Sequence, residues 1–144
     1  MMNYCSRPEI NELEYHPWAD AQAHELVRWC LSKRIAVIAY GSLGGSKNGA
    51  SSGTNIRAVA ERHGVSTARV LLRWAVQQGV VVIPGATSPT HIEDNLNASF
   101  EPSLTADDMS AIAHDQPPTT FRRWNSLCKE GSTSANGCTP AVDA

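Results

Sequence analysis

The sequence lacks several features that would place it in a common functional class. It has no run of basic residues mixed with aromatic ones and its formal net charge is -2, so nucleic acid is not an expected partner. No apolar run approaches the roughly 20 residues of a membrane-spanning helix. The first ten residues lack the apolar core of a signal peptide. We therefore expect no membrane partner and a cytoplasmic location.

Cysteine is also scarce, and its spacing carries no pattern. The four cysteines at positions 5, 30, 128 and 138 form no CxxC pair and have no neighbouring histidine pair. Reduced thiols therefore suit the sequence better than a zinc site or a disulfide framework, and no metal site is predicted. What is present, 144 residues with 42% hydrophobic and 18% charged content, is typical of one globular domain.

Short apolar runs alternate with helical patterns along the chain. The runs predict strands at 10–15, 35–40 and 80–83, of which the last two are apolar throughout and favour strands covered on both faces of a sheet. The order β, α, β, α, α, β, α, α predicts an α/β fold with a parallel sheet and right-handed crossovers. Helices are expected over 21–34, 54–63 and 66–78 and from residues 89 and 105 onward.

Several residues mark the ends and the inner faces of these helices. Thr54, Ser66, Ser88 and Thr105 are expected N-caps, the last in a capping box with Asp108. Gly64 and Gly79 suit the C-terminal ends of two helices. The apolar stripes expected to pack inward include Leu26 with Val27 and Cys30, Ile92 with Leu96, and Met109 with Ile112 and Ala113.

The loop between residues 83 and 88 has the composition of an anion-binding turn. It joins a strand to a helix that begins at Ser88 and Pro89, so free backbone N–H groups and the positive end of the helix dipole meet there. The small side chains of Gly85, Ala86 and Thr87 would let a phosphate approach the backbone. An ordinary βα turn of the same composition is the alternative. A second loop, rich in glycine and serine, follows the strand at 35–40 and is expected to be mobile.

Three strands are too few for a closed parallel fold. A complete (βα)₈ barrel takes about 250 residues, so this sheet would have two open edges, which favours marginal folding and self-association through them. Either another segment pairs those edges or the sequence is part of a larger unit. From residue 116 onward the composition shifts to Pro, Thr, Ser, Gly and Asn, which predicts a loosely ordered tail over 116–144.

Four blocks of the sequence resemble the C-terminal half of the aldo-keto reductases in order and spacing. They read INELEYHP, IAVIAYGSLGG, VAERHGVSTARVLLRWAVQQGVVVIPGATSPTHIEDNL and LTADDMSAI, and together they cover about Pro8 to Ala113. The resemblance implies that residues 1–115 form the C-terminal part of a (βα)₈ TIM barrel, strands six to eight with their helices. It implies NADP(H) or NAD(H) as cofactor.

The resemblance also assigns residues to the nicotinamide and the pyrophosphate. Tyr40 matches the aromatic residue that stacks on the nicotinamide, the alternative being a tyrosine that fills the core at a strand end. Glu12 stands where the family usually has the glutamine that binds the carboxamide, and a carboxylate can only accept in that contact. The residues that match the pyrophosphate loop are Gly41, Ser42, Leu43, Gly44 and Gly45.

At the adenosine end the sequence departs from the family. After Ile83 and its proline, members that prefer NADP commonly carry Lys and Ser or Thr, and an Arg a few residues later. Here Gly85 and Ala86 with Thr87 follow, and His91 takes the place of the Arg, so the preference between NADP and NAD is open. Asp94 and Asn95 match a pair that contacts adenine, or are ordinary polar residues of a helix.

No catalytic residue is predicted among the matched blocks, because the family's catalytic Asp, Tyr, Lys and His belong to its first half. His16 lies in a turn where the family's histidine is structural, and Trp18 either lines a substrate pocket or packs in the core. We therefore predict the cofactor-binding half of an NAD(P)H-dependent oxidoreductase that reduces a small aldehyde or ketone. The alternative is a non-catalytic relative that binds nucleotide or a protein partner. Three histidines are expected on solvated helix surfaces: His24, His63 and His114.

Overall fold

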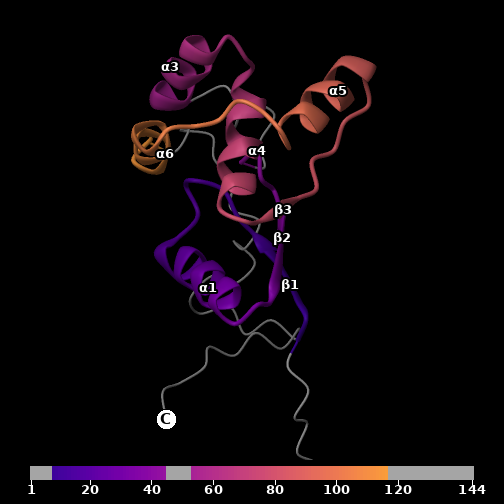
Figure 1. Ribbon diagram of the computed structural model, residues 1–144, viewed down its shortest axis with the longest axis vertical. Helices are drawn as coiled ribbons and strands as arrows, with labels where there is room; N and C mark the ends of the chain where they lie inside the picture. The colour runs from indigo at the N-terminus through magenta and orange to yellow at the C-terminus, as the bar shows by residue number, and fades with distance from the viewer. Residues whose placement is uncertain (1–7, 45–52, 117–144) are drawn as a thin grey trace, which may run out of the picture.

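A three-stranded parallel sheet lies at the centre of the computed structural model, which describes residues 8–44 and 53–116 (Figure 1). The strand order is β1-β2-β3, so the predicted α/β fold with a parallel sheet is confirmed for this part of the chain. No helix in the described ranges is long and apolar enough to cross a membrane. The elements are β1 (Ile10–Glu14), α1 (Ala21–Ser32), β2 (Ala36–Tyr40), α3 (Thr54–His63), α4 (Thr67–Gln77), β3 (Val81–Val82), α5 (Pro89–Asn97) and α6 (Ala106–Ala113).

Described helices cover only one face of the sheet. Val37 and Ala39 of β2 are completely buried and belong to the hydrophobic core with residues of α1 and α4. Val81 pairs with Ile38 and therefore lies on the opposite face, where it is more than half exposed. The prediction that the two apolar strands are covered on both faces is wrong for β3, because no described helix packs on its second face.

Two of the apolar stripes that the sequence predicts are narrower than expected. On α1, Val27 and Cys30 are buried but Leu26 is largely exposed, and on α6 Ile112 is buried but Ala113 is exposed. Each of these helices meets the core along a single line of side chains, so neighbouring apolar positions remain in solvent. The stripe on α5 is not covered by described residues at all, because that helix has no buried residue.

The helix ends follow their capping residues at most positions. Ser66 and Ser88 accept hydrogen bonds from the backbone N–H groups three residues later, at 3.0 and 3.2 Å. Thr105 forms the predicted capping box with Asp108. Gly64 and Gly79 adopt positive φ angles of 65° and 82°, as expected for residues that end helices. The prediction that Thr54 is the N-cap of α3 is wrong, because Gly53 is the N-cap and Thr54 is the first residue of the helix.

The cap that Gly53 cannot provide comes from the end of α6. The Asp115 carboxylate accepts from the backbone N–H of Asn55 at 3.2 Å and from that of Ile56 at 3.1 Å. A Cβ added to Gly53 would lie 2.0 Å from Asp115 Oδ2, so only glycine fits beside this carboxylate. The side chain of Asn55 donates to the Ala111 carbonyl at 2.9 Å. These bonds fix the start of α3 to the end of α6.

We expect Asp115→Ala to lower the free energy of unfolding by about 1–2 kcal/mol, because two N–H groups at the start of α3 lose their acceptor. Urea denaturation followed by circular dichroism measures the loss. Glu61→Ala, which removes a carboxylate from an exposed position of the same helix, is the matched control and should change stability by less than about 0.5 kcal/mol. Equal losses in the two variants would show that Asp115 acts only as a surface charge.

Two of the three histidines expected in solvent are in contact with other elements. His63 lies 2.9 Å from the Asp108 carboxylate, which also accepts from Arg62 and so joins α3 to α6. Burial alone would raise the pKa of Asp108, but the hydrogen bonds from His63, Arg62 and Thr105 hold this pKa well below its ordinary value. For His63 the prediction of a solvated surface is therefore wrong.

His24 is the second of these histidines, and it packs edge-on against Tyr15 and Trp74 with ring centroids 5.1 and 6.0 Å away. Burial lowers the pKa of His24. Burial also raises the pKa of Tyr15 to about 12, and the Tyr15 hydroxyl donates to Gln78 at 3.0 Å. The rings of this cluster connect α1, the end of β1 and α4, so His24 belongs to the core contact between them. His114 is exposed, as expected.

Candidate functional site

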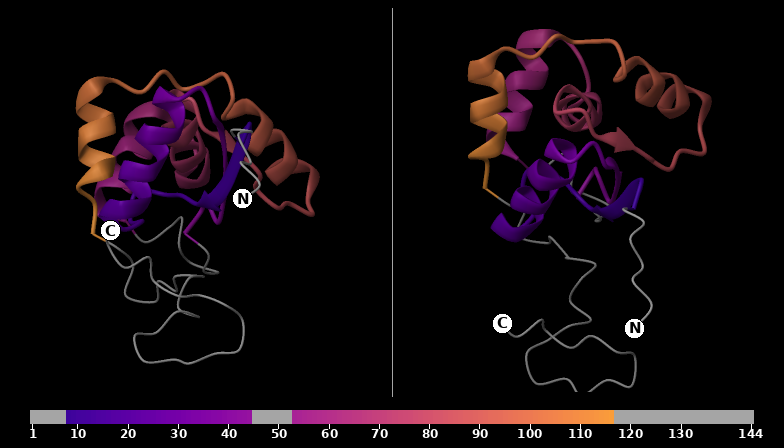
Figure 2. Two further views of the ribbon diagram at one scale, coloured as in Figure 1. Left: turned by 90° about the horizontal axis from the view of Figure 1, so that it is seen from below. Right: turned by 60° about the horizontal axis from the view of Figure 1, so that its bottom comes forward.

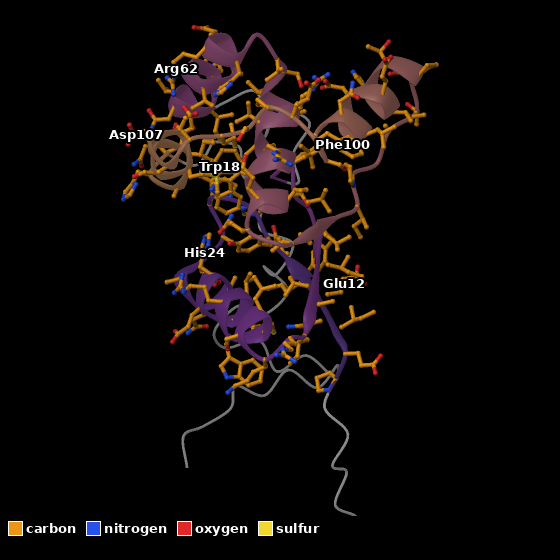
Figure 3. All side chains as sticks on the ribbon, viewed as in Figure 1. Glu12, Trp18, His24, Arg62, Phe100 and Asp107 are labelled. Carbon is orange, nitrogen blue, oxygen red and sulfur yellow. The ribbon has the colours of Figure 1, made fainter. Side chains whose placement is uncertain are left out.

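The two residues assigned to the nicotinamide lie on one face of the sheet. Glu12 pairs with Ile38, and Glu14 pairs with Tyr40, so alternation of side chains places Glu12 and Tyr40 on the same side. This is the face that no described helix covers, and Figure 3 shows Glu12 on the side of the sheet opposite to α1. Glu12 is exposed and Tyr40 is half-buried. A flat ligand would therefore find an accessible aromatic ring with a carboxylate on the neighbouring strand.

A tight turn follows β2 where the resemblance places the pyrophosphate loop. Gly41 and Gly44 have φ angles of 62° and 81°, values that favour glycine, and the Gly44 N–H donates to the Gly41 carbonyl at 2.8 Å. The buried Ser42 hydroxyl donates to the Ala39 carbonyl at 2.9 Å, and Leu43 packs against the core. The side chains of Ser42 and Leu43 therefore hold the turn, and the backbone remains as its polar surface. Gly45 lies outside the described residues.

The second turn lies at the same edge of the sheet, because β2 and β3 are parallel and both turns follow a strand. It runs from Ile83, which is more than half exposed, to the N-cap Ser88. A Cβ added to Gly85 would meet no atom within 4 Å, so the space beside this backbone is open. Ala86 is half-buried, whereas Thr87 and His91 are exposed. The backbone beside Gly85 is therefore accessible at the start of α5, and anion binding there stays a prediction.

Asp94, one of the two residues assigned to adenine, has partners within the chain. Its Oδ1 lies 2.7 Å from Arg69 Nε and 2.6 Å from Arg69 Nη2, and its Oδ2 accepts from the Ser66 hydroxyl. Arg69 also reaches Glu101 at 3.3 Å. The sequence did not indicate this network, because the two residues joined by each of these contacts lie 25 or more residues apart. Asn95, the second residue of the pair, is half-buried.

A buried polar pair lies at the end of β1. Glu14 Oε1 and His16 Nε2 are 3.1 Å apart, and His16 is only 1% exposed. Trp18 follows, buried in the hydrophobic core with its ring centroid 5.9 Å from that of His16. The burial of Trp18 supports packing over pocket lining, and the second role stays a prediction. Glu14, which the sequence reasoning missed, contacts the histidine that follows it by two residues.

The part of the chain that the structure describes contains no group of three or more His, Cys, Asp or Glu side chains placed to hold a metal ion. Cys30, the one cysteine within the described ranges, is buried and forms no disulfide. Among the predicted site residues, the accessible polar groups lie in the two turns, at the N-terminus of α5 and on the open sheet face. Parallel βα units with turns at the carboxyl edge are the arrangement in which α/β proteins, barrels and open sheets alike, bind ligands.

Comparison with known sequences identifies the family. The sequence model of the aldo/keto reductase family matches residues 4–114. The glycerol 2-dehydrogenase (NADP(+)) of Hypocrea jecorina is 38% identical over 112 residues, covering 74% of this chain and 34% of that protein. A probable NAD(P)H-dependent D-xylose reductase of Arthroderma otae is 34% identical over 119 residues, covering 74% and 36%. The chain belongs to the aldo/keto reductase family, and it spans about a third of the length of these relatives.

Solved structures agree with this assignment. The aldose reductase of Giardia lamblia superposes with a TM-score of 0.66 at 35% identity, covering 74% of this chain and 36% of that one. A Gox0644 variant in complex with NADPH superposes with a TM-score of 0.64 at 33% identity, covering 74% and 37%. The family resemblance predicted from the four sequence blocks is confirmed.

Proposed function

We propose that this chain supplies the NAD(P)(H)-binding portion of a carbonyl reductase, corresponding to strands six to eight of the family's (βα)₈ barrel. The observation that supports it best is the shared face of Glu12 and Tyr40, which ends at the edge where both turns open. The aromatic ring of Tyr40 and the carboxylate of Glu12 therefore lie beside the backbone donors of the two turns, which matches a nicotinamide followed by phosphates. Relatives named for NADP(+) or NAD(P)H support the same ligand class.

The residues present fit a nicotinamide dinucleotide. Tyr40 offers a half-buried aromatic face for the nicotinamide ring, and Glu12 accepts from the carboxamide N–H. The backbone of Gly41 and Gly44 follows, and the open space at Gly85 admits an anion to the start of α5. When bound, the cofactor supplies a hydride to the carbonyl carbon. The residues of this chain bind and orient it on the open face.

Proton donation to the carbonyl oxygen is assigned to the portion of the family's barrel outside this chain. His16 is buried and lies 3.1 Å from Glu14, so it is not accessible to a carbonyl on the open face. Its contact with Glu14 serves the turn after β1. The proposed substrate is a small aldehyde or ketone, which the relative named as a D-xylose reductase supports.

A non-catalytic function is the second candidate. The uncovered sheet face and its two unpaired edges support a protein that binds a nucleotide or another polypeptide without turnover. The reductase requires nucleotide binding and the non-catalytic candidate permits it, whereas only the reductase requires proton donors from a further portion.

Nucleotide binding can be tested on the isotopically labelled 144-residue chain. We expect NADPH to shift the amide signals of Tyr40 to Gly44 and of Gly85 to Thr87 in nuclear magnetic resonance spectra. Tyr40→Ala should weaken binding by about three- to tenfold, because it removes a stacking contact of about 0.5–1.5 kcal/mol. Trp29→Ala, which removes an exposed aromatic ring from α1, is the control and should leave affinity unchanged. Shifts confined to other residues, or none at millimolar NADPH, would exclude the proposed site.

A further inference from the structure

The open face of the sheet brings a carboxylate and an aromatic ring close together. Glu12 and Tyr40 stand on neighbouring strands and are offset by two residues, because Tyr40 pairs with Glu14. Parallel strands lie about 4.8 Å apart and two residues span about 6.6 Å, so the Cα atoms of Glu12 and Tyr40 are about 8 Å apart. Both side chains are long enough to contact the same ligand on this face.

Glu12 carries the accessible negative charge of β1. The other carboxylate of this strand, Glu14, is buried and lies 3.1 Å from His16. Glu12 is exposed, and within residues 8–44 and 53–116 no Lys, Arg or His side chain forms an ion pair with it. The charge of Glu12 is therefore not neutralised by a described neighbour and remains available to a ligand.

Both groups favour a flat cation. The face of an aromatic ring is negatively polarised, so a cation over it is stabilised. A carboxylate attracts positive charge directly, and the attraction is larger where water is partly excluded. The oxidised nicotinamide ring is a flat aromatic cation, whereas the reduced ring is neutral. The two side chains therefore distinguish between the two forms of the cofactor.

We propose that Glu12, beside Tyr40, makes this site bind the oxidised cofactor in preference to the reduced one. The inference rests on the proposed function, which places the nicotinamide over Tyr40 and its carboxamide at Glu12. A glutamine at this position accepts and donates hydrogen bonds without adding a charge. Glutamate keeps only the accepting half of that contact and adds a negative charge beside the ring. Glu12 is thus a residue that sets the preference for one oxidation state.

The size of the preference follows from the separation of the charges. Unit charges about 6–8 Å apart, in surroundings between protein and bulk water, attract one another by an amount that corresponds to about three- to tenfold in affinity. The reduced ring gains none of this attraction because it carries no charge. The effect of Glu12 should therefore appear in the ratio of the two dissociation constants.

Titration of both cofactor forms tests the proposal. NADP⁺ and NADPH are added to the full 144-residue chain and to its Glu12→Gln variant, and the amide signals of Tyr40 to Gly44 report binding in nuclear magnetic resonance spectra. We expect Glu12→Gln to raise the dissociation constant of NADP⁺ about three- to tenfold. That of NADPH should change by less than about twofold, because the amide still accepts from the carboxamide N–H.

Glu25→Gln is the matched control. It removes the same charge from an exposed position of α1, on the side of the sheet opposite to Glu12 (Figure 3). The ratio of the two dissociation constants should stay within about twofold of the wild-type value. Because Glu12 and Glu25 are both exposed, the circular dichroism melts of the two variants should match that of the wild type.

Charge reversal and salt give two further readouts. Glu12→Lys should weaken NADP⁺ binding relative to NADPH binding more than Glu12→Gln does. The difference between wild type and Glu12→Gln should shrink in about 0.5 M salt, because screening acts on the charge. An unchanged ratio in Glu12→Gln, or an equal change in Glu25→Gln, would overturn the inference while binding at Tyr40 leaves the proposed function intact. If neither nucleotide shifts these amides, both the inference and the proposed function are overturned.

Discussion

The purified chain is expected to oxidise NADPH in the presence of aldehydes or ketones no faster than a protein-free blank. General acid assistance is worth about 10² to 10⁴-fold in rate, and the proposed function assigns the proton donors to another portion of the barrel. The described residues contain one histidine near the carboxyl edge of β1, and it is 1% exposed. Absorbance at the NADPH band, followed with a panel of small carbonyl compounds, measures the rate.

His16→Ala is the informative variant if turnover occurs. Because His16 is buried against Glu14, the substitution should lower stability without any activity to lose. Turnover by the wild-type chain that disappears in correctly folded His16→Ala would make His16 a proton donor and refute its structural assignment. His114→Ala, at an exposed position, is the control for removal of a histidine.

Gly85→Lys combined with His91→Arg is expected to strengthen NADPH binding by about a hundredfold or more while changing NADH binding little. Charge-assisted hydrogen bonds to a phosphate are worth about 1 to 3 kcal/mol each, and by the resemblance the two positions match those where NADP-preferring members carry cations. The structure accommodates both side chains, since a Cβ at Gly85 meets no atom within 4 Å and His91 is exposed. Wild-type protein should discriminate little between the two cofactors.

Titration of both cofactors against both proteins measures the change. Ser110→Lys with Ala113→Lys adds positive charge at exposed positions of α6, on the opposite side from α5 (Figure 2), and controls for general electrostatic attraction. Equal gains for NADPH and NADH, or a wild type already strongly selective for NADPH, would place the 2′-phosphate elsewhere.

Local signals in the sequence were sufficient for the elements and most of their ends. The side chains of Ser66, Ser88 and Thr105 accept hydrogen bonds from N–H groups three residues later. Such caps can therefore be predicted from the sequence without knowledge of the fold. Tyr40 and Glu12 were assigned by resemblance, and the strand register then placed them on one face. The local sequence pattern therefore predicts which segments form helices and strands, and the pairing of the strands decides which side chains lie together.

The sequence alone does not predict contacts between residues that lie far apart along the chain. The exposure of Val81 and Leu96 depends on which segments cover them, which apolar character alone does not reveal. Arg69 and Asp94 are ordinary surface residues by pattern, and only the approach of α4 to α5 makes them a pair. Thr54 was assigned as a cap because the true acceptor, Asp115, lies 60 residues from Asn55.

That distant cap has a consequence for how the chain folds. The carboxylate that accepts from the first N–H groups of α3 belongs to Asp115, which is synthesised only after α4, β3, α5 and α6. Closing a loop of this length costs chain entropy before any bond is gained, and contacts of large sequence separation slow folding. The first turn of α3 is thus capped by a residue that follows α6. Until Asp115 is in place, the first turn of α3 lacks the acceptor that caps it.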